Sequence, residues 1–253
     1  MSGAAANPNS GVALKARLRY SKLGKVRFTS HRDMARIWER TLRRAGLPVA
    51  YSQGYSPRAK LAFGLALPTT FESRAEYVDF NFSTDDVDVT GFAELLTPLL
   101  PVGVTAIDAV VLRGDAVSLQ QAVTSTTWLL QVEAAPEAVL SWIERVVEAP
   151  AIELTRERKG KETTDDVRPA IHALRLSEPE ECSDADDSLI SITAELATQP
   201  RALRPNELLS VLAPEFTFRR GRRLHQWIAS DGAQLDPLSA GATQTPRAEL
   251  CAS

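Results

Sequence analysis

One order of hydrophobic patterns occurs twice along this 253-residue chain, and that repetition limits the fold more than any other feature. Apolar residues at every second position indicate strands, and a period near 3.6 residues indicates helices. The first occurrence predicts strands at 14–20, 49–52, 60–67, 75–82 and 104–112, with helices at 31–45 and 89–100. The second predicts strands at 127–133, 152–158, 170–176, 189–197 and 216–227, with helices at 136–148 and 204–212. The strands at 152–158 and 170–176 are expected to pair as a hairpin around KGKETTDD.

Two successive β-α-β-β-α-β patterns predict an α+β fold with two tandem ferredoxin-like halves. The polar stretch RGDAVSLQQAVTST between them is expected to be a linker. One larger α+β domain with a shared sheet is the alternative. The predicted organisation is a disordered tail at 1–11, a first half at 12–112, a linker at 113–126, a second half at 127–228 and a disordered tail at 229–253.

Several classes of protein do not fit the composition. The sequence has no run of about 18 apolar residues, so we expect no membrane-spanning helix. The opening residues MSGAAANPNSG lack the charged and apolar regions of a secretory signal. Cys182, Cys251 and the three histidines lie far apart in sequence, which disfavours a zinc or iron–sulfur site. We therefore expect a cytoplasmic protein that holds no metal or cofactor and has no membrane partner.

Charge is distributed very unevenly along the chain. The formal net charge is −3, yet residues 15–60 contain thirteen Lys and Arg against two acids, a local charge of +11. Residues 81–150 reverse this balance, with ten acids against two arginines. Such segregation can steer an anionic partner to one face of a protein.

The helix predicted at 31–45 carries much of this charge. Ser30 is a suitable N-cap, and Gly46 is expected to end the helix. At 100° per residue, Met34, Trp38 and Leu42 share one side, so we predict that Trp38 lies in the core. The opposite side holds what we call the arginine ladder, namely Arg32, Arg36, Arg40 and Arg43. A solvated helix face usually mixes charges, and like charges four residues apart repel, so the ladder predicts a bound anion.

Other basic and aromatic residues extend this prediction. Lys15, Arg17 and Arg19 alternate with apolar residues on the first predicted strand, and Lys25 follows in a turn. The loop SQGYSPRAK combines stacking faces with charge, as single-stranded nucleic acids require. The candidates are Tyr51, directly before this loop, and Tyr55, Arg58 and Lys60 within it. The segment FRRGRR in the second half adds Arg219, Arg220, Arg222 and Arg223. We expect the ladder, the basic strand face and the loop to form one continuous surface for a polyanion, most simply RNA.

His31 is the one candidate for catalysis. It begins the basic helix, where the helix dipole disfavours imidazolium. Together with Tyr20 and Lys25 it would supply the general base, acid and phosphate clamp of a metal-independent ribonuclease. The simpler interpretation is that His31 caps the helix or forms a hydrogen bond. We expect a binding protein rather than an enzyme.

Two segments, residues 19–80 and the later KGKETTDDVRP at 159–169, resemble a known family. The first includes RYSKLGKVRFTSHRDMARIWERTLRRAG and YSQGYSPRAK. The chain is similar here to the radical SAM-linked protein family, a domain of unknown function (DUF2344). Members occur beside, or fused behind, a B12-binding-type radical SAM protein, so the resemblance implies a radical SAM partner. It supplies no catalytic residue. More loosely, the paired halves resemble paired-ferredoxin RNA-binding proteins such as the repeat-associated CRISPR RNA endonucleases, by fold analogy alone.

Three functions follow as hypotheses. The first is an accessory module that binds RNA, or presents a substrate, for a radical SAM enzyme. The second is a metal-independent RNA-processing enzyme that uses His31. The third is a protein-interaction scaffold whose basic face docks on an acidic partner without binding RNA. The first agrees best with the local charge, the ladder and the Tyr/Arg loop.

Overall fold

The computed structural model of the chain describes residues 12–242, except 54, 115, 159, 183–185, 187 and 213–215. The first half contains β1 (Leu14–Lys22), the 3-10 turn η1 (Gly24–Phe28), α1 (His31–Arg44), β2 (Leu61–Phe63), β3 (Glu72–Phe82), α2 (Phe92–Leu96) and β4 (Val104–Val111). The second contains α3 (Leu119–Ala122), β5 (Ser125–Glu133), α4 (Pro136–Glu148), β6 (Glu153–Arg158), β7 (Lys161–Asp166), β8 (Ile171–Leu176), β9 (Ile190–Ala197), α5 (Pro205–Leu212), β10 (Thr217–Ser230), β11 (Ala233–Leu235) and α6 (Pro237–Gly241).

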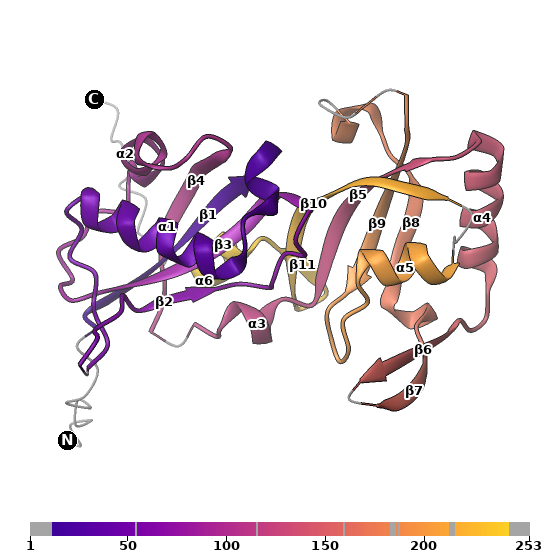
Figure 1. Cartoon of the computed structure of the whole chain (residues 1–253). Helices are drawn as coiled ribbons and strands as arrows, with labels where there is room; N and C mark the ends of the chain where they lie inside the picture. Colours follow the sequence, from indigo (N-terminus) through magenta and orange to yellow (C-terminus); the bar gives the residue numbers. More distant parts are fainter. Residues whose placement is uncertain are drawn as a thin grey trace, which may run out of the picture.

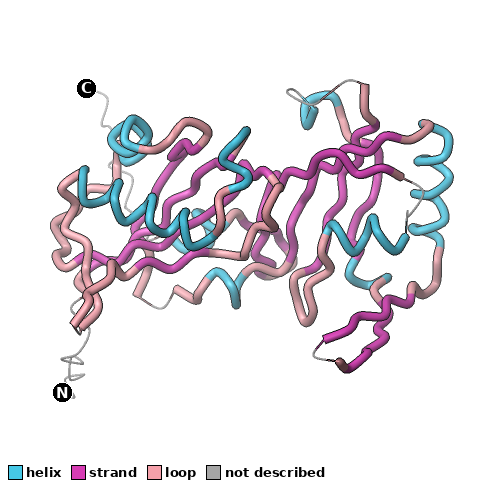
Figure 2. The backbone as a smooth tube through the Cα atoms, in the orientation of Figure 1, coloured by secondary structure: helices cyan, strands magenta, loops and turns pink. Residues whose placement is uncertain are grey.

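A single large sheet runs through the mixed α+β fold (Figures 1 and 2). Within the described residues it has nine strands, in the order β4-β1-β3-β10-β5-β9-β8, with β2 beside β3 and β11 beside β10. The two halves meet where β3 and β10 pair in parallel, through Glu72 opposite Arg222 and Ser73 opposite Arg223. The sheet is therefore shared by the two halves, as the alternative interpretation of the sequence allowed.

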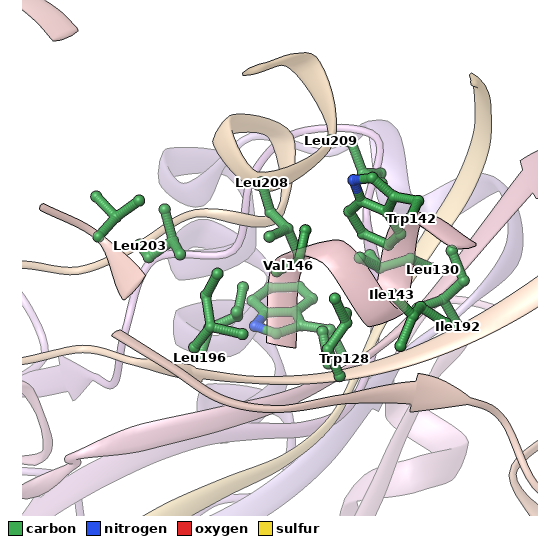
Figure 3. Packing of buried hydrophobic residues seen from close by; sticks show 14 of the residues in the cluster. Trp128, Leu130, Trp142, Ile143, Val146, Ile192, Leu196, Leu203, Leu208 and Leu209 are labelled. Carbon is green, nitrogen blue, oxygen red and sulfur yellow. The ribbon is translucent and has the colours of Figure 1, made fainter. Parts of the chain in front are cut away.

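Helices α1, α4 and α5 cover one face of this sheet (Figure 1). On α1, Met34, Trp38 and Leu42 pack against the apolar residues of β1 and β3. Trp38 is fully buried, so its predicted place in the core is confirmed. In the second half, α4 and α5 pack over β5 and β9, with Trp142 and Trp128 at the centre of the cluster (Figure 3).

The opposite face of the first half is covered by α3 and α6. Leu119 and Leu238 pack there against Ala75 and Tyr77 of β3. The predicted disordered tail at 229–253 is therefore wrong for its first part, because β11 pairs with β10 and α6 returns to cover β1. The segments 1–11 and 243–253, both predicted to be tails, lie outside the described residues.

Three local predictions also differ from the structure. The pairing of 152–158 with 170–176 is wrong, because β6 turns directly into β7 through Gly160, whose φ of 72° suits a tight hairpin. The strand expected at 49–52 is reduced to isolated bridges, such as Val49 opposite Phe82. The helix expected at 89–100 is only α2, since Pro98 lies in a 3-10 turn that follows it.

Candidate nucleic-acid interface

Helix α1 presents the arginine ladder to solvent. Its first turn is fixed by Ser30, whose Oγ accepts a hydrogen bond from the Asp33 amide at 3.2 Å. The helix ends before Gly46, whose φ of 69° lies in the left-handed region. Because the apolar side of α1 is held against the sheet, the opposite side cannot turn inward. All four ladder arginines, and Arg44 beside them, are exposed.

Acids neutralise little of this charge. The Arg36 guanidinium lies 3.1 Å from the Asp33 carboxylate. In the part of the chain that the structure describes, Arg32, Arg40 and Arg43 form no ion pair with a carboxylate. The hydrogen bond from Ser30 lowers the pKa of Asp33, and the charges of Arg36 and Arg32 add to that effect. The ladder therefore remains a region of positive charge that an external anion can reach.

Two further exposed groups lie near the ends of α1 in sequence. Before the helix, Lys25 is exposed and the Phe28 ring, 57% exposed, lies 4.8 Å from the Arg27 guanidinium carbon. After the helix, the loop predicted to bind nucleic acid is closed by a hydrogen bond from Ser52 N to Arg58 O of 2.8 Å. Its predicted side chains remain available, since Tyr51, Tyr55 and Arg58 are exposed and Lys60 is partly buried. Tyr55 is fully exposed.

The basic face of β1 does not join this surface, so the predicted continuous surface is wrong. Ala16, Leu18 and Tyr20 contact the core under α1, so the residues between them point to the other side of the sheet. Arg17 is 1% exposed and binds the Asp79 carboxylate through Nε at 2.7 Å and Nη2 at 3.1 Å. Lys15 pairs with Asp79 at 3.4 Å, and Arg19 with Asp236 at 3.5 Å.

The arginines of FRRGRR are also placed differently from the prediction. Arg220, Arg222 and Arg223, which we call the interface arginines, bind carboxylates of β3 where the halves meet. Arg222 and Arg223 are each 2% exposed, so they cannot form part of an RNA-binding surface. Arg219 is exposed and pairs with Glu133.

The interface arginines form two networks of ion pairs with β3, and Glu72 is the centre of the first. It has no solvent exposure and accepts hydrogen bonds from Arg220, Arg222 and the amide of Gly24. Burial alone raises the pKa of Glu72, but the hydrogen bonds from these donors outweigh burial and lower it. The carboxylate therefore stays charged at neutral pH and holds Arg220 and Arg222 against β3.

A β-bulge places the second network on the other face of the sheet. Four residues of β3, Ser73 to Glu76, lie opposite only three residues of β1, Lys22 to Tyr20. Glu76 therefore faces α1, whereas Glu72 faces away. Arg223 binds Glu76 on this face, and its Nη1 lies 2.8 Å from the Glu76 carboxylate.

The groups proposed for catalysis are not brought together. His31 is exposed and packs edge-on against Phe63, with ring centroids 5.0 Å apart. The hollow that it shares with Tyr20 measures about 20 Å³, room for no more than a water molecule, and Lys25 is not part of it. Burial raises the pKa of Tyr20 well above its ordinary value, which makes it a poor proton donor. The geometry therefore does not favour a ribonuclease site at His31.

The other histidines and the acids give no metal site among residues 12–242 as far as the structure describes them. His225 stacks on Trp227 at 4.9 Å, and burial lowers its pKa. His172 lies 3.5 Å from Glu195. None of the helices placed in the structure is long and apolar enough to span a membrane.

The acids that hold the buried arginines were not predicted. Glu72, Glu76 and Asp79 all lie on β3 and all three are buried, but Glu72 precedes the strand predicted at 75–82. Three acids within eight residues of a central strand are unusual, because charged residues are rarely buried unless they are paired. That pattern was the available signal for buried arginine partners.

Comparisons with known proteins locate the chain within one family. The model of a family described as "Uncharacterized protein conserved in bacteria (DUF2344)" matches residues 15–205. No curated protein matches the sequence. Among solved structures, the chain is similar to one in the "Crystal Structure of a Cbf5-Nop10-Gar1 Complex", with 6% identity and a TM-score of 0.47. That match covers 83% of this chain and 48% of the other, so this chain spans about half its length.

Proposed function

The chain belongs to this family of uncharacterised bacterial proteins (DUF2344), and from that premise we propose that it is a cytoplasmic accessory module that binds RNA for a radical SAM enzyme. The observation that carries the RNA-binding part is the arginine ladder, which is exposed along a whole helix face and has one carboxylate partner, Asp33, among the residues that the structure describes. The radical SAM partner rests on the resemblance of residues 19–80 and 159–169 to radical SAM-linked proteins.

The ladder has dimensions that suit a nucleic-acid backbone. With a rise of 1.5 Å per residue, the distance from Arg32 to Arg43 is about 16 Å, enough to face several successive phosphates. Arginine binds phosphate through a planar fork of donors, and it stays charged at any physiological pH. Contacts of this kind fix the position of a nucleic acid without reading its sequence. Tyr55 would add a stacking surface for an unpaired base.

The fold that we propose for this module is a pair of ferredoxin-like units. The strand order is β4-β1-β3-β2 in the first half and β10-β5-β9-β8 in the second. In each half, the first strand of a β-α-β-β-α-β unit lies between the fourth and the third, and the second lies beside the third. This shared order supports the proposed fold. The unit boundaries we propose, 12–112 and 127–228, need one amendment. Residues 229–242 return to the first half, where Pro237 O accepts a hydrogen bond from Arg17 at 3.1 Å.

The test is the affinity for single-stranded RNA at about 100 mM salt, where phosphate contacts still contribute strongly. Wild type should bind, and the double variant Arg36→Ala/Arg40→Ala should bind much more weakly. Arg175→Ala/Arg201→Ala is the control for net charge, since it removes two exposed arginines from the second half, which pair with Glu181 and Asp165, and it should retain wild-type affinity.

Three outcomes oppose the proposal in different ways. Wild-type protein without RNA affinity would contradict RNA binding. Equal losses in both double variants would mean that net charge, and not the ladder, sets the affinity. If RNA does not bind, but a radical SAM partner binds wild type and not the ladder variant, the arginines serve as a protein-docking surface.

A further inference from the structure

A hollow of about 200 Å³ lies where the two halves meet. The loop after β2 supplies one wall through Leu65, Ala66 and Pro68, and the segment before α5 supplies another through Leu203. Trp128 of β5 and Arg223 of β10 line it from the sheet. Figure 3 shows Leu203 at the edge of the apolar cluster and Trp128 near its middle. The volume is below the range of about 300–1,000 Å³ usual for drug-sized ligands, so it suits a single small ring system.

Arg223 gives this hollow a specific polar group. It is 2% exposed, and its guanidinium carbon lies 4.8 Å from the centre of the Trp128 ring. Nη1 donates to Glu76 at 2.8 Å and to Leu65 O at 3.1 Å, and Nη2 donates to Ala66 O at 3.0 Å. Nε is buried and has no hydrogen-bond partner. A buried donor without a partner is costly, so a ligand that supplies an acceptor would be favoured.

The surroundings define the chemistry of that acceptor. The charge of Arg223 is already balanced by Glu76, so its two remaining N–H groups, on Nε and Nη2, favour a neutral acceptor, such as a carbonyl oxygen or a ring nitrogen. Most of the other lining groups are apolar, which favours a flat, uncharged ring. Arg204 is exposed and also lines the hollow, where it can meet a phosphate attached to that ring. A nucleobase with its sugar-phosphate meets all three requirements.

The hollow and the arginine ladder lie on the same face of the shared sheet. Tyr20 packs edge-on against Trp38 of α1, and Glu76 is opposite Tyr20 in the strand register. Arg223 binds Glu76 and is opposite Trp128 on β5. A strand of RNA bound along α1 can therefore reach the hollow without crossing the sheet.

We infer that this hollow receives one unpaired nucleobase of the RNA whose phosphates lie along α1. The inference rests on the proposed function and adds to it a site that can discriminate between bases. The ladder supplies affinity that is independent of sequence, whereas a buried base meets a donor in a fixed position, so its identity matters.

The test fills the hollow without altering Arg223. Ala66 is exposed at its rim, so Ala66→Phe should block it and leave the ion pairs intact. Ala62→Phe is the matched control, because Ala62 is also an exposed alanine, on β2, but does not line this hollow. Circular dichroism and thermal melting establish that both variants fold. Affinities are then measured for short homo-oligoribonucleotides of A, C, G and U.

Wild type should prefer one homopolymer. Ala66→Phe should lose that preference and on the order of tenfold in affinity for the preferred sequence, comparable to the loss of one bound base. Its dependence on salt and the behaviour of Ala62→Phe should be unchanged. Retained affinity and preference in folded Ala66→Phe would overturn the inference.

A separate arm distinguishes this inference from the proposed function. If wild type binds no RNA, the proposed function fails, and the hollow is then tested with free nucleoside 5′-monophosphates by NMR titration. Binding that Ala66→Phe abolishes and Ala62→Phe retains would keep the hollow as a nucleotide site. No binding of any of the four nucleotides would remove it.

Discussion

The arginine ladder of α1 and the interface arginines of β10 occupy opposite environments, although both are dense basic clusters in sequence. The ladder arginines are exposed, and only Arg36 forms an ion pair with a carboxylate within the described residues. Arg222 and Arg223 are almost fully buried, and each binds a glutamate of β3 at 2.8 Å. A local run of positive charge therefore predicts a binding surface only where the fold brings no acids to it.

The difference arises from β3, which contributes different residues to the two clusters. Under α1 it contributes apolar side chains such as Val78 and Phe80, which hold the helix and leave its arginines outside. Beside β10 it contributes Glu72 and Glu76, about 150 residues earlier in the chain than the arginines they bind. Phe71 also lies so close to Gly221 that a Cβ there would come within 2.1 Å of its ring. Packing between the two halves therefore accounts for both the buried arginines and the glycine of FRRGRR.

The largest expected effect is the loss of Glu72. Removing one partner of a buried ion pair leaves an uncompensated charge and typically costs about 3–5 kcal/mol. We expect Glu72→Gln to lower the free energy of unfolding by that amount, measured by urea denaturation. Asp33→Asn, which removes an exposed partner of Arg36, should cost far less, because an exposed ion pair contributes little to stability. Similar free energies of unfolding for the two variants would contradict the claim that the interface arginines stabilise the fold more than the ladder arginines do.

The contribution of Glu72 to the free energy of unfolding should decrease at acidic pH. The pKa of Glu72 lies below its ordinary value of 4.5 in the folded protein, so its stabilising contribution is complete above 4.5. It is lost as the pH falls through the lower folded value. The gap in unfolding free energy between wild type and Glu72→Gln should therefore be constant near neutral pH and narrow in acid below pH 4.5. A gap that stays constant throughout this range would mean that Glu72 is not linked to the interface arginines.

A smaller effect on RNA affinity is expected from Tyr55, in the loop SQGYSPRAK that follows α1 in sequence. Tyr55 is fully exposed, so Tyr55→Ala should leave the stability unchanged. If its ring stacks on a base, RNA affinity should fall by about 1–3 kcal/mol without a change in salt dependence. Val117→Ala, another truncation of an exposed apolar side chain, is the control and should retain full affinity. Unchanged binding by Tyr55→Ala would confine the interface to charged groups.

The smallest effect should be on the stability of the ladder variant. Arg36 and Arg40 are exposed, and surface substitutions usually change stability by less than about 0.5 kcal/mol. Arg36→Ala/Arg40→Ala also removes repulsion between like charges, which offsets part of any loss. Thermal melting should place it close to wild type. A large loss of stability would show that the ladder contributes to the fold, as the interface arginines do.

Periodicity predicted the parts of this fold that depend on local order. The helices at α1 and α4, and Trp38 in the core, follow from patterns within 15 residues. The partner of Arg222 could not be predicted in this way, because Glu72 reaches it only through the pairing of β3 with β10. The same limit explains β1, where alternation located Arg17 on one side of a strand but gave no sign that α6 covers that side.

The most direct measurement is the slope of log affinity against log salt for single-stranded RNA. Each phosphate contact adds about 0.7 to the magnitude of that slope for single strands. Two lost contacts in Arg36→Ala/Arg40→Ala should therefore reduce it by about 1.4 relative to wild type, while the Arg175→Ala/Arg201→Ala control keeps the wild-type slope. A ladder variant with the wild-type slope, or a wild type whose binding does not depend on salt, would contradict the assignment of the exposed arginines to phosphates.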